Sequence, residues 1–378
     1  TANSLIADDR ADLVFFGGKL ITGNPQQPAG QAIAVNDGKI LAVGTDAEIQ
    51  RWIGDETRVV DADGRTIVPG FNDAHLHPVP IYPVSSRLGT VPCDPAHAAD
   101  LTKLITALRE KADLTPNGEW IIGSGYQDTK FGRHPTRADL DRASTDHPIY
   151  IEHSSGHVAA VNSLALQLAQ VDTDTPDPRG GAFDRDANGL PTGVLRETAK
   201  QMVMNAGPPR PQATIAEQIA GYQRCFAEYV KHGITSIQIA GTTPDMVSLL
   251  QKMEIDSRPI RIYAMLKVDH LDDLKRIKRA GGLGDDRLRL GAIKKWFGNS
   301  LSGRTCWLYE PYADRDGYYG IPPKDSQAEI NRQVMEIHSA GFQACIHANG
   351  DREIDMLLDA YERALTESPR DNHRHRIE

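Results

Sequence analysis

The pattern of apolar and polar residues changes near residue 214 from short strands to alternating helices and strands. Thr214 and Glu217 form a capping box, and the apolar periodicity that follows predicts a helix to His232, ended by Gly233. The apolar run 234–239 comes next and is typical of a buried strand. The alternation predicts further strands at 260–266, 288–297 and 342–347, and helices at 271–280, 326–341 and 352–366. Repeated units of this kind form a parallel sheet, and this many in a row favour an α/β barrel of the (β/α)₈ type.

The first part of the chain has a different pattern. Residues from about 12 to 66 predict short strands joined by tight turns, with a hairpin at Asn36-Asp37-Gly38. Residues 78–232 fit the barrel pattern poorly, although 120–122 and 148–151 resemble strands and 172–193 is rich in Gly, Pro and Asp. We interpret 78–232 as a long excursion that follows the first barrel strand. Such excursions lie over the mouth of a barrel, where selectivity for substrates is set.

Composition excludes several classes of partner. The 378 residues carry a net charge of −9 and contain no run of Lys or Arg, which argues against nucleic acid and anionic membranes as partners. No apolar stretch approaches the ~18 residues of a membrane helix. The four cysteines are far apart and contain no CxxC, which argues against a disulfide framework and favours a cytoplasmic location. Because the first residue is Thr1 and not Met, export with a signal peptide already removed is the alternative.

The segment 69–78 carries the clearest chemical motif. His75 and His77 follow an apolar strand and a Pro-Gly pair, and side chains two residues apart on a strand point to the same face. Two neutral imidazoles on one face can chelate a divalent metal at the end of the strand where barrel active sites lie. The alternative is a chance pair of histidines near a turn. We interpret the pair as metal ligands.

Two further residues occupy comparable positions. His347 closes the strand 342–347, so it is a third candidate ligand, the alternative being a core histidine with satisfied hydrogen bonds. Lys294 lies within a strand predicted to be buried, where a charged amine is unfavourable unless it is neutralised or paired. Carbamylation by carbon dioxide would turn the amine into a carboxylate-like bridge between two metals. The alternative is a lysine that reaches solvent at the end of the strand.

An ordered set of motifs resembles amidohydrolase family 3, the branch that includes enzymes similar to formamide deformylases. The runs that carry the resemblance are PGFNDAHLHP at 69–78, GYQ at 125–127, GHVAAVNSLAL at 156–166, LRETA at 195–199, IKKWFGNSLSGRT at 293–305, GFQACIHANGD at 341–351 and the final HRHRIE. The family implies a (β/α)₈ barrel over 67–378, with residues 1–66 as the N-terminal part of a small β-sandwich. One or two divalent ions, most often Zn²⁺, would be held by the ligands His75, His77 and His347, with Lys294 as a catalytic, carbamylated bridge.

The resemblance also suggests substrate-binding residues and two departures. His157 and Glu197 match family motifs, and Tyr126 and Arg304 are weaker candidates for contacts with substrate, the alternative for all four being ordinary loop residues. Where the family has Asp-Gly-Ser after the lysine, this chain has Gly298-Asn299-Ser300. The next ligand of the family would follow Glu378, and the aspartate of its last strand would lie further on. We therefore expect about six of eight barrel strands in this chain, and an incomplete catalytic set.

These observations predict a hydrolase that cleaves a carbon–nitrogen bond in a small non-peptide amide through a metal-activated water. An esterase or lactonase would use the same residues and remains an alternative, and a deaminase of the same superfamily has less use for a lysine on a strand. A metal-binding protein without catalysis is the alternative from another class. A homodimer is possible. The expected partner is a small-molecule amide, and neither nucleic acid nor a membrane is expected.

Overall fold

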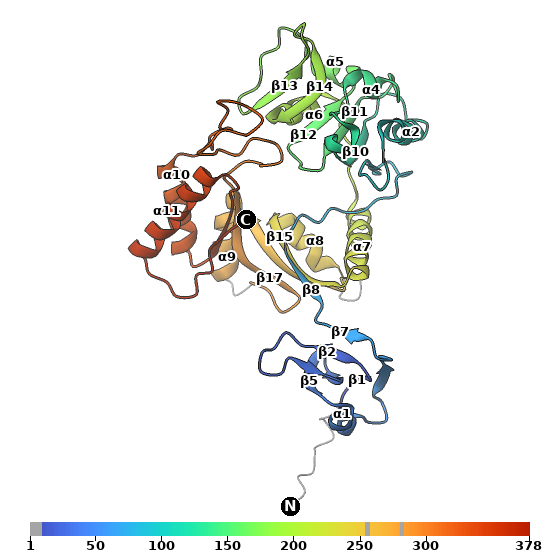
Figure 1. Ribbon diagram of the computed structural model, residues 1–378, viewed down its shortest axis with the longest axis vertical. Helices are drawn as coiled ribbons and strands as arrows, with labels where there is room; N and C mark the ends of the chain where they lie inside the picture. The colour runs from blue at the N-terminus through green and yellow to red at the C-terminus, as the bar shows by residue number, and fades with distance from the viewer. Residues whose placement is uncertain (1–9, 254–257, 280–282) are drawn as a thin grey trace, which may run out of the picture. The chain divides into compact units, whose positions relative to one another are not determined.

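The computed structural model describes residues 10–253, 258–279 and 283–378 (Figure 1). The chain divides into two compact units. One comprises residues up to Asn72 together with Gly233–Thr235, and the other comprises Asp73–His232 with Ser236–Glu378. Residues 1–9, assigned to the N-terminal unit by the sequence, and residue 280, the expected end of a helix, lie outside the described residues. Each unit is described by itself below.

The N-terminal unit is built from two small sheets. A four-stranded sheet has the order β5-β4-β1-β6 and a three-stranded sheet the order β3-β2-β7. The hairpin predicted at Asp37-Gly38 is confirmed, since both residues have positive φ (47° and 69°), as a two-residue type I′ turn requires. The elements are β1 Leu13–Phe16, β2 Lys19–Ile21, β3 Ala29–Gly30, β4 Ala32–Asn36, β5 Lys39–Gly44, α1 Asp46–Ile49, η1 Gln50–Trp52, β6 Arg58–Asp61 and β7 Thr66–Ile67.

A curled, parallel six-stranded sheet forms the centre of the second unit. Its order is β19-β18-β17-β16-β15-β8, and the pairs from β15 to β19 are parallel (Figure 1). The strands are β8 Phe71–Leu76, β15 Ile234–Thr242, β16 Arg261–Lys267, β17 Leu288–Trp296, β18 Gln343–His347 and β19 Arg376–Ile377. The two edges are β8 and β19, so the described strands form a half-barrel. The six strands match the number expected from the sequence.

The helices between these strands begin where the sequence predicts. Capping boxes at Thr214 and Ser326 begin α7 and α10. In each, the side chain of Glu217 or Glu329 accepts a hydrogen bond from the backbone N–H of the N-cap residue. Pro244 occupies the first turn of α8. The elements are α7 Ile215–Lys231, α8 Pro244–Lys252, η3 Val268–His270, α9 Leu271–Arg279, α10 Gln327–Ser339 and α11 Asp351–Glu367. Right-handed β-α-β connections of this kind place helices against one face of the sheet and leave the other face free for a site.

The inner face of the half-barrel has a small apolar core. Ala240, Met265, Ala292 and Cys345 form one buried cluster contributed by β15, β16, β17 and β18. Cys345 is therefore a core residue. All four cysteines are buried and free, and the sequence analysis had argued against a disulfide framework. None of the helices in the described ranges is long and apolar enough to cross a membrane.

The excursion contains more regular structure than the sequence indicated. It forms its own six-stranded sheet, in the order β13-β14-β12-β11-β10-β9. The elements are β9 Val91–Pro92, α2 Leu101–Ala112, β10 Ile121–Tyr126, α3 Asp128–Phe131, α4 Arg137–Asp141, β11 Ile149–His153, β12 Val158–Val161, α5 Ser163–Leu168, β13 Gly181–Arg185, β14 Pro191–Glu197 and α6 Thr198–Ala206. The strands β10 and β11 were predicted, whereas the β13–β14 hairpin lies in the Gly, Pro and Asp-rich stretch. The two strands of this hairpin are joined by the ion pair between Arg196 of β14 and Asp184 of β13 at 2.7 Å.

Candidate active site

The two histidines of the HxH motif lie together at the end of β8. The rings of His75 and His77 are 5.2 Å apart and nearly perpendicular. His77 also stacks on Trp296 of β17, with ring centroids 6.0 Å apart. Burial lowers the pKa of His77, and the nearby charges of Lys294 and His75 lower it further. At neutral pH His77 is therefore a neutral imidazole, which is the form that binds a metal.

Lys294 is fully buried, and its Nζ has no hydrogen-bond partner among the described residues. Burial lowers its pKa to about 8, and the amine lies 5.0 Å from the centre of the Trp296 ring. The next residue, Lys295, points to the other face of the strand and pairs with Asp325 at 2.6 Å. The alternative in which Lys294 reaches solvent is therefore wrong. A buried amine without a partner is a costly group that a ligand or a modification would satisfy.

His347 ends β18, directly beside Trp296 in the strand pairing. Its Nε2 donates a hydrogen bond to the carbonyl oxygen of Asn299 at 3.0 Å, so Nδ1 carries the lone pair. Burial lowers the pKa of His347 and keeps the ring neutral. One ring nitrogen is thus satisfied, as expected for a core histidine, while the other is available to a ligand. A hydrogen bond that fixes the tautomer in this way is typical of metal-ligating histidines.

Glu378 is a residue of the site that the sequence analysis quoted only as part of a motif. Its side chain is 3% exposed and contacts His75 Nδ1 and Arg376 Nε. Burial raises its pKa, but the hydrogen bond from His75 and the charge of Arg376 outweigh burial, so the pKa is lowered. His75 therefore donates from Nδ1 and keeps the lone pair on Nε2. Arg376 also donates to the carbonyl oxygen of Ala74 at 3.2 Å, so the two edges of the curled sheet are linked at this point. The position of Glu378 after an apolar strand residue, as for His347, could have identified it.

The four strand ends thus bring three imidazoles, an amine and a carboxylate to one region. Within residues 10–253, 258–279 and 283–378, no three His, Cys, Asp or Glu side chains surround a single point as metal ligands. The donor types are nevertheless those that a borderline divalent ion accepts, and the unpartnered Nζ of Lys294 lies among them. The residues therefore fit a metal by their chemistry and protonation, with side-chain adjustment needed to coordinate it.

A second group of candidates comes from the excursion. His157 Nδ1 donates to the Glu197 carboxylate at 2.9 and 3.0 Å, and Thr305 Oγ1 donates to the same carboxylate at 3.2 Å. Glu197 has a φ of 47°, an unfavourable conformation for a residue with a side chain. The charge of His157 contributes to the lowered pKa of His347, so the two rings are near each other. The structure therefore connects the His157–Glu197 pair with the strand-end cluster.

The two weaker candidates have different surroundings. Tyr126 is fully buried in the core of the excursion, where its hydroxyl lies 3.0 Å from His134 Nδ1 and burial raises its pKa. No contact of Tyr126 with the strand-end cluster is found in the described part of the chain, so this residue supports the excursion. Arg304 has a φ of 55° and pairs with Asp314 at 2.8 Å. It lines a cavity of about 320 Å³ together with Glu197.

Comparison with known proteins identifies the family. The family model described as "Amidohydrolase family" matches residues 58–378. The chain belongs to the amidohydrolase family. The resemblance noted in the motifs is thereby confirmed.

Individual relatives of this amidohydrolase-family chain are distant but extend over most of it. YtcJ of Bacillus subtilis, which is named as an amidohydrolase, is 28% identical over 93% of this chain and 66% of its own length. The N-substituted formamide deformylase of Arthrobacter pascens is 26% identical over 95% of this chain and 67% of its own length. A metal-dependent hydrolase of Pyrococcus horikoshii shares the fold, with a TM-score of 0.66 and 24% identity over 97% of this chain and 74% of its own. The chain spans about two thirds of the length of these two curated relatives.

Proposed function

We propose that the complete protein is a metal-dependent hydrolase that cleaves the carbon–nitrogen bond of a small non-peptide amide. The observation that carries the proposal is the buried Nζ of Lys294, which has no hydrogen-bond partner among the described residues and lies near three histidines that each keep a ring nitrogen for a ligand. Membership of the amidohydrolase family supports hydrolysis, and the relative named as a formamide deformylase supports an N-formyl or N-acyl amine as the substrate class.

The residues would hold one or two divalent ions, with Zn²⁺ best matched to the imidazole donors. His75 would bind through Nε2, because its Nδ1 is hydrogen-bonded to the Glu378 carboxylate. His347 would bind through Nδ1, because its Nε2 donates to the carbonyl oxygen of Asn299. With its pKa lowered to about 8, part of the Lys294 population is neutral at pH 7, and a neutral amine can add carbon dioxide and release a proton to give a carbamate, whose oxygens would be available to the metal ions. A divalent cation in this position supplies Lewis acidity and a bound water of lowered pKa.

The His157–Glu197 pair favours an amide over an ester. Because Nδ1 of His157 donates to Glu197, its Nε2 is left as a hydrogen-bond acceptor near His347. A secondary amide can donate its N–H to this nitrogen, whereas an ester has no hydrogen to offer. A site built to receive an N–H discriminates strongly against an analogue that lacks it.

Metal analysis of the full-length protein tests the first half of the proposal. The His75→Ala/His77→Ala variant should lose most of its bound metal, whereas His97→Ala/His270→Ala, at two histidines paired with nearby aspartates, should retain it. Lys294→Ala should lose one metal equivalent if the carbamate bridges two ions. Equal metal content in all four proteins would refute the ligand assignment.

Turnover tests the second half. Formate release from N-benzylformamide should be detected in the full-length enzyme, and release from benzyl formate should be slower. In His157→Phe the preference for the amide should shrink by more than about tenfold, since one hydrogen bond to the amide is lost. Faster cleavage of the ester would identify an esterase, and bound metal without turnover of either compound would identify a metal-binding protein without catalysis.

A further inference from the structure

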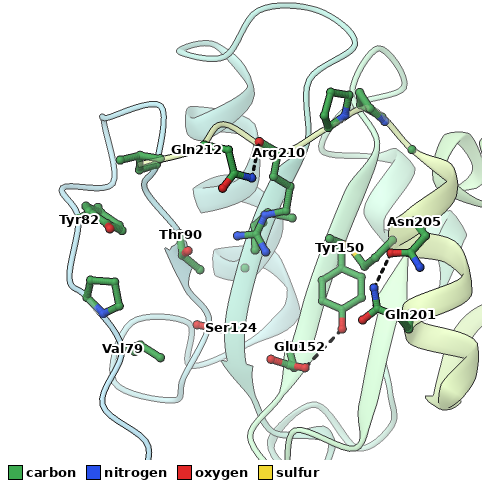
Figure 2. A pocket seen from close by; sticks show the side chains of 18 of the residues that line it. Val79, Tyr82, Thr90, Ser124, Tyr150, Glu152, Gln201, Asn205, Arg210 and Gln212 are labelled. Atoms are coloured by element: carbon green, nitrogen blue, oxygen red, sulfur yellow. Dashed lines mark hydrogen bonds between the residues drawn. The ribbon is translucent and has the colours of Figure 1, made fainter. Parts of the chain in front are cut away.

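The excursion contains a cavity that is separate from the candidate active site. Its volume is about 1000 Å³, larger than the cavity beside Glu197. The walls come from residues 79–90, the strands β10 and β11, helix α6 and the segment 207–212 (Figure 2). None of His75, His77, Lys294 and His347 lines it. A molecule bound here would therefore be a second ligand and not the substrate of the strand-end cluster.

Side-chain contacts hold the walls of this cavity in place. The buried amine of Lys111 donates to the backbone carbonyls of Val84 and Ser86, both at 2.8 Å, which fixes the segment that follows the HxH motif. Arg87 donates to the carbonyl of Gln212 at 3.1 Å, which ties the same segment to the opposite rim. Cavities whose walls are held by such contacts are formed before a ligand arrives, and this is the usual condition of small-molecule sites.

One positive charge in the cavity has no partner. Figure 2 shows the side chain of Arg210 extending between Thr90 and Tyr150, and its guanidinium makes no ion pair or hydrogen bond within the described ranges. Burial raises the pKa of Tyr150, and the charge of Arg210 acts against that shift, so this hydroxyl and the guanidinium are neighbours. The carboxylate of Glu152 is already taken, by Lys200 at 3.1 Å and by the Tyr150 hydroxyl at 3.4 Å. The charge that remains to be neutralised by a ligand is that of Arg210.

The wall as a whole has somewhat more apolar than polar surface. Leu88, Ile122 and Met204 contribute side chains, and Pro80 and Pro208 also line the cavity and have no backbone N–H to donate. An apolar wall with a few convergent polar groups selects a ligand with an apolar body and a single polar end. A dianion such as phosphate fits less well, because one guanidinium leaves its second charge unpaired.

We propose that this cavity binds a small organic carboxylate with an apolar body. The carboxylate lies on the guanidinium of Arg210, and the body packs against Ile122 and Met204. The proposal is independent of the proposed hydrolysis, since binding requires neither the metal nor Lys294.

Calorimetric titration of the full-length protein tests the proposal, with phenylacetate, phenylacetamide and inorganic phosphate as probes. Phenylacetate should bind more tightly than both other probes. Arg210→Gln should weaken phenylacetate about fivefold, the effect of a partly exposed ion pair, and should leave phenylacetamide unchanged. Arg332→Gln, a matched exposed arginine on α10, should change neither affinity. Because Arg210 is exposed, its variant is expected to fold, and a circular dichroism melt checks this.

A second variant tests the apolar wall. Met204→Gln places an amide against the body of the ligand and should weaken both phenyl compounds together. Absence of phenylacetate binding, equal affinity for phosphate, or an affinity for phenylacetate that Arg210→Gln leaves unchanged would each overturn the proposal. Metal removal with a chelator should not alter phenylacetate binding, and a loss on metal removal would mean that the probe binds at the strand-end cluster instead.

Discussion

Replacement of Lys294 by methionine should stabilise the metal-free protein, although the same change should remove its function. The wild-type amine is fully buried with no hydrogen-bond partner in the part of the chain that the structure describes, and its pKa is lowered from 10.5 to about 8. A difference of this size corresponds to about 3 kcal/mol by which protonated Lys294 destabilises the folded state. Methionine has nearly the same length and no charge, so it should recover most of that free energy at pH 7.

The expected gain depends on pH with a defined sign. Between pH 8 and 10.5 the folded wild-type protein binds fewer protons than the unfolded chain, so its stability rises with pH in that window. The advantage of Lys294→Met should therefore be complete below pH 8 and should disappear as the pH approaches 10.5. Chemical denaturation of chelator-treated protein, followed by the fluorescence of Trp296 and the other tryptophans, measures the free energy of unfolding of the wild type and of Lys294→Met at each pH.

The neighbouring lysine provides a matched control. Lys295 lies on the same strand and is also buried, but it is paired with Asp325 at 2.6 Å. Lys295→Met leaves that carboxylate without its partner and should destabilise the protein by about 1–3 kcal/mol. If Lys294→Met proves as destabilising as Lys295→Met, or if its effect is the same at pH 7 and pH 10, the assignment of an unpaired buried ammonium at Lys294 is wrong.

Three further predictions concern other parts of the structure. Gly207→Ala should destabilise the protein by about 1–3 kcal/mol in denaturant titration, because the added Cβ would lie 2.2 Å from the Trp120 ring; an unchanged midpoint would contradict this packing. Asn162→Ala should cost about 3 kcal/mol by the same assay, since its amide makes four hydrogen bonds to backbone groups; a loss below about 1 kcal/mol would contradict that role. Burial lowers the pKa of His375 to about 3, so stability should fall as the pH falls from 6.5 towards 3, and His375→Gln should flatten that dependence.

The candidate site shows which residues the sequence could identify. His75, His77, Lys294 and His347 were found because each lies in or directly after an apolar strand, where a polar side chain contradicts the local pattern. Glu378 was not assigned a role, because its contact with His75 joins residues 303 positions apart, on the two edges of the sheet. Only the curl of the sheet brings these edges together. The place of Tyr126 in a motif likewise gave no indication that its hydroxyl lies 3.0 Å from His134 Nδ1 in the core of the excursion.

The sequence by itself determined the parallel α/β part of the fold, because apolar periodicity, capping boxes and glycines at helix ends are local properties. It also determined which residue types can bind a metal and on which strands they lie. The tertiary structure decided the protonation and the partners of those residues. Lys294 and Lys295 are adjacent and chemically identical, yet one is unpaired with a lowered pKa and the other is neutralised by Asp325. The two side chains point to opposite faces of β17, and only the folded chain brings Asp325 to the face that carries Lys295.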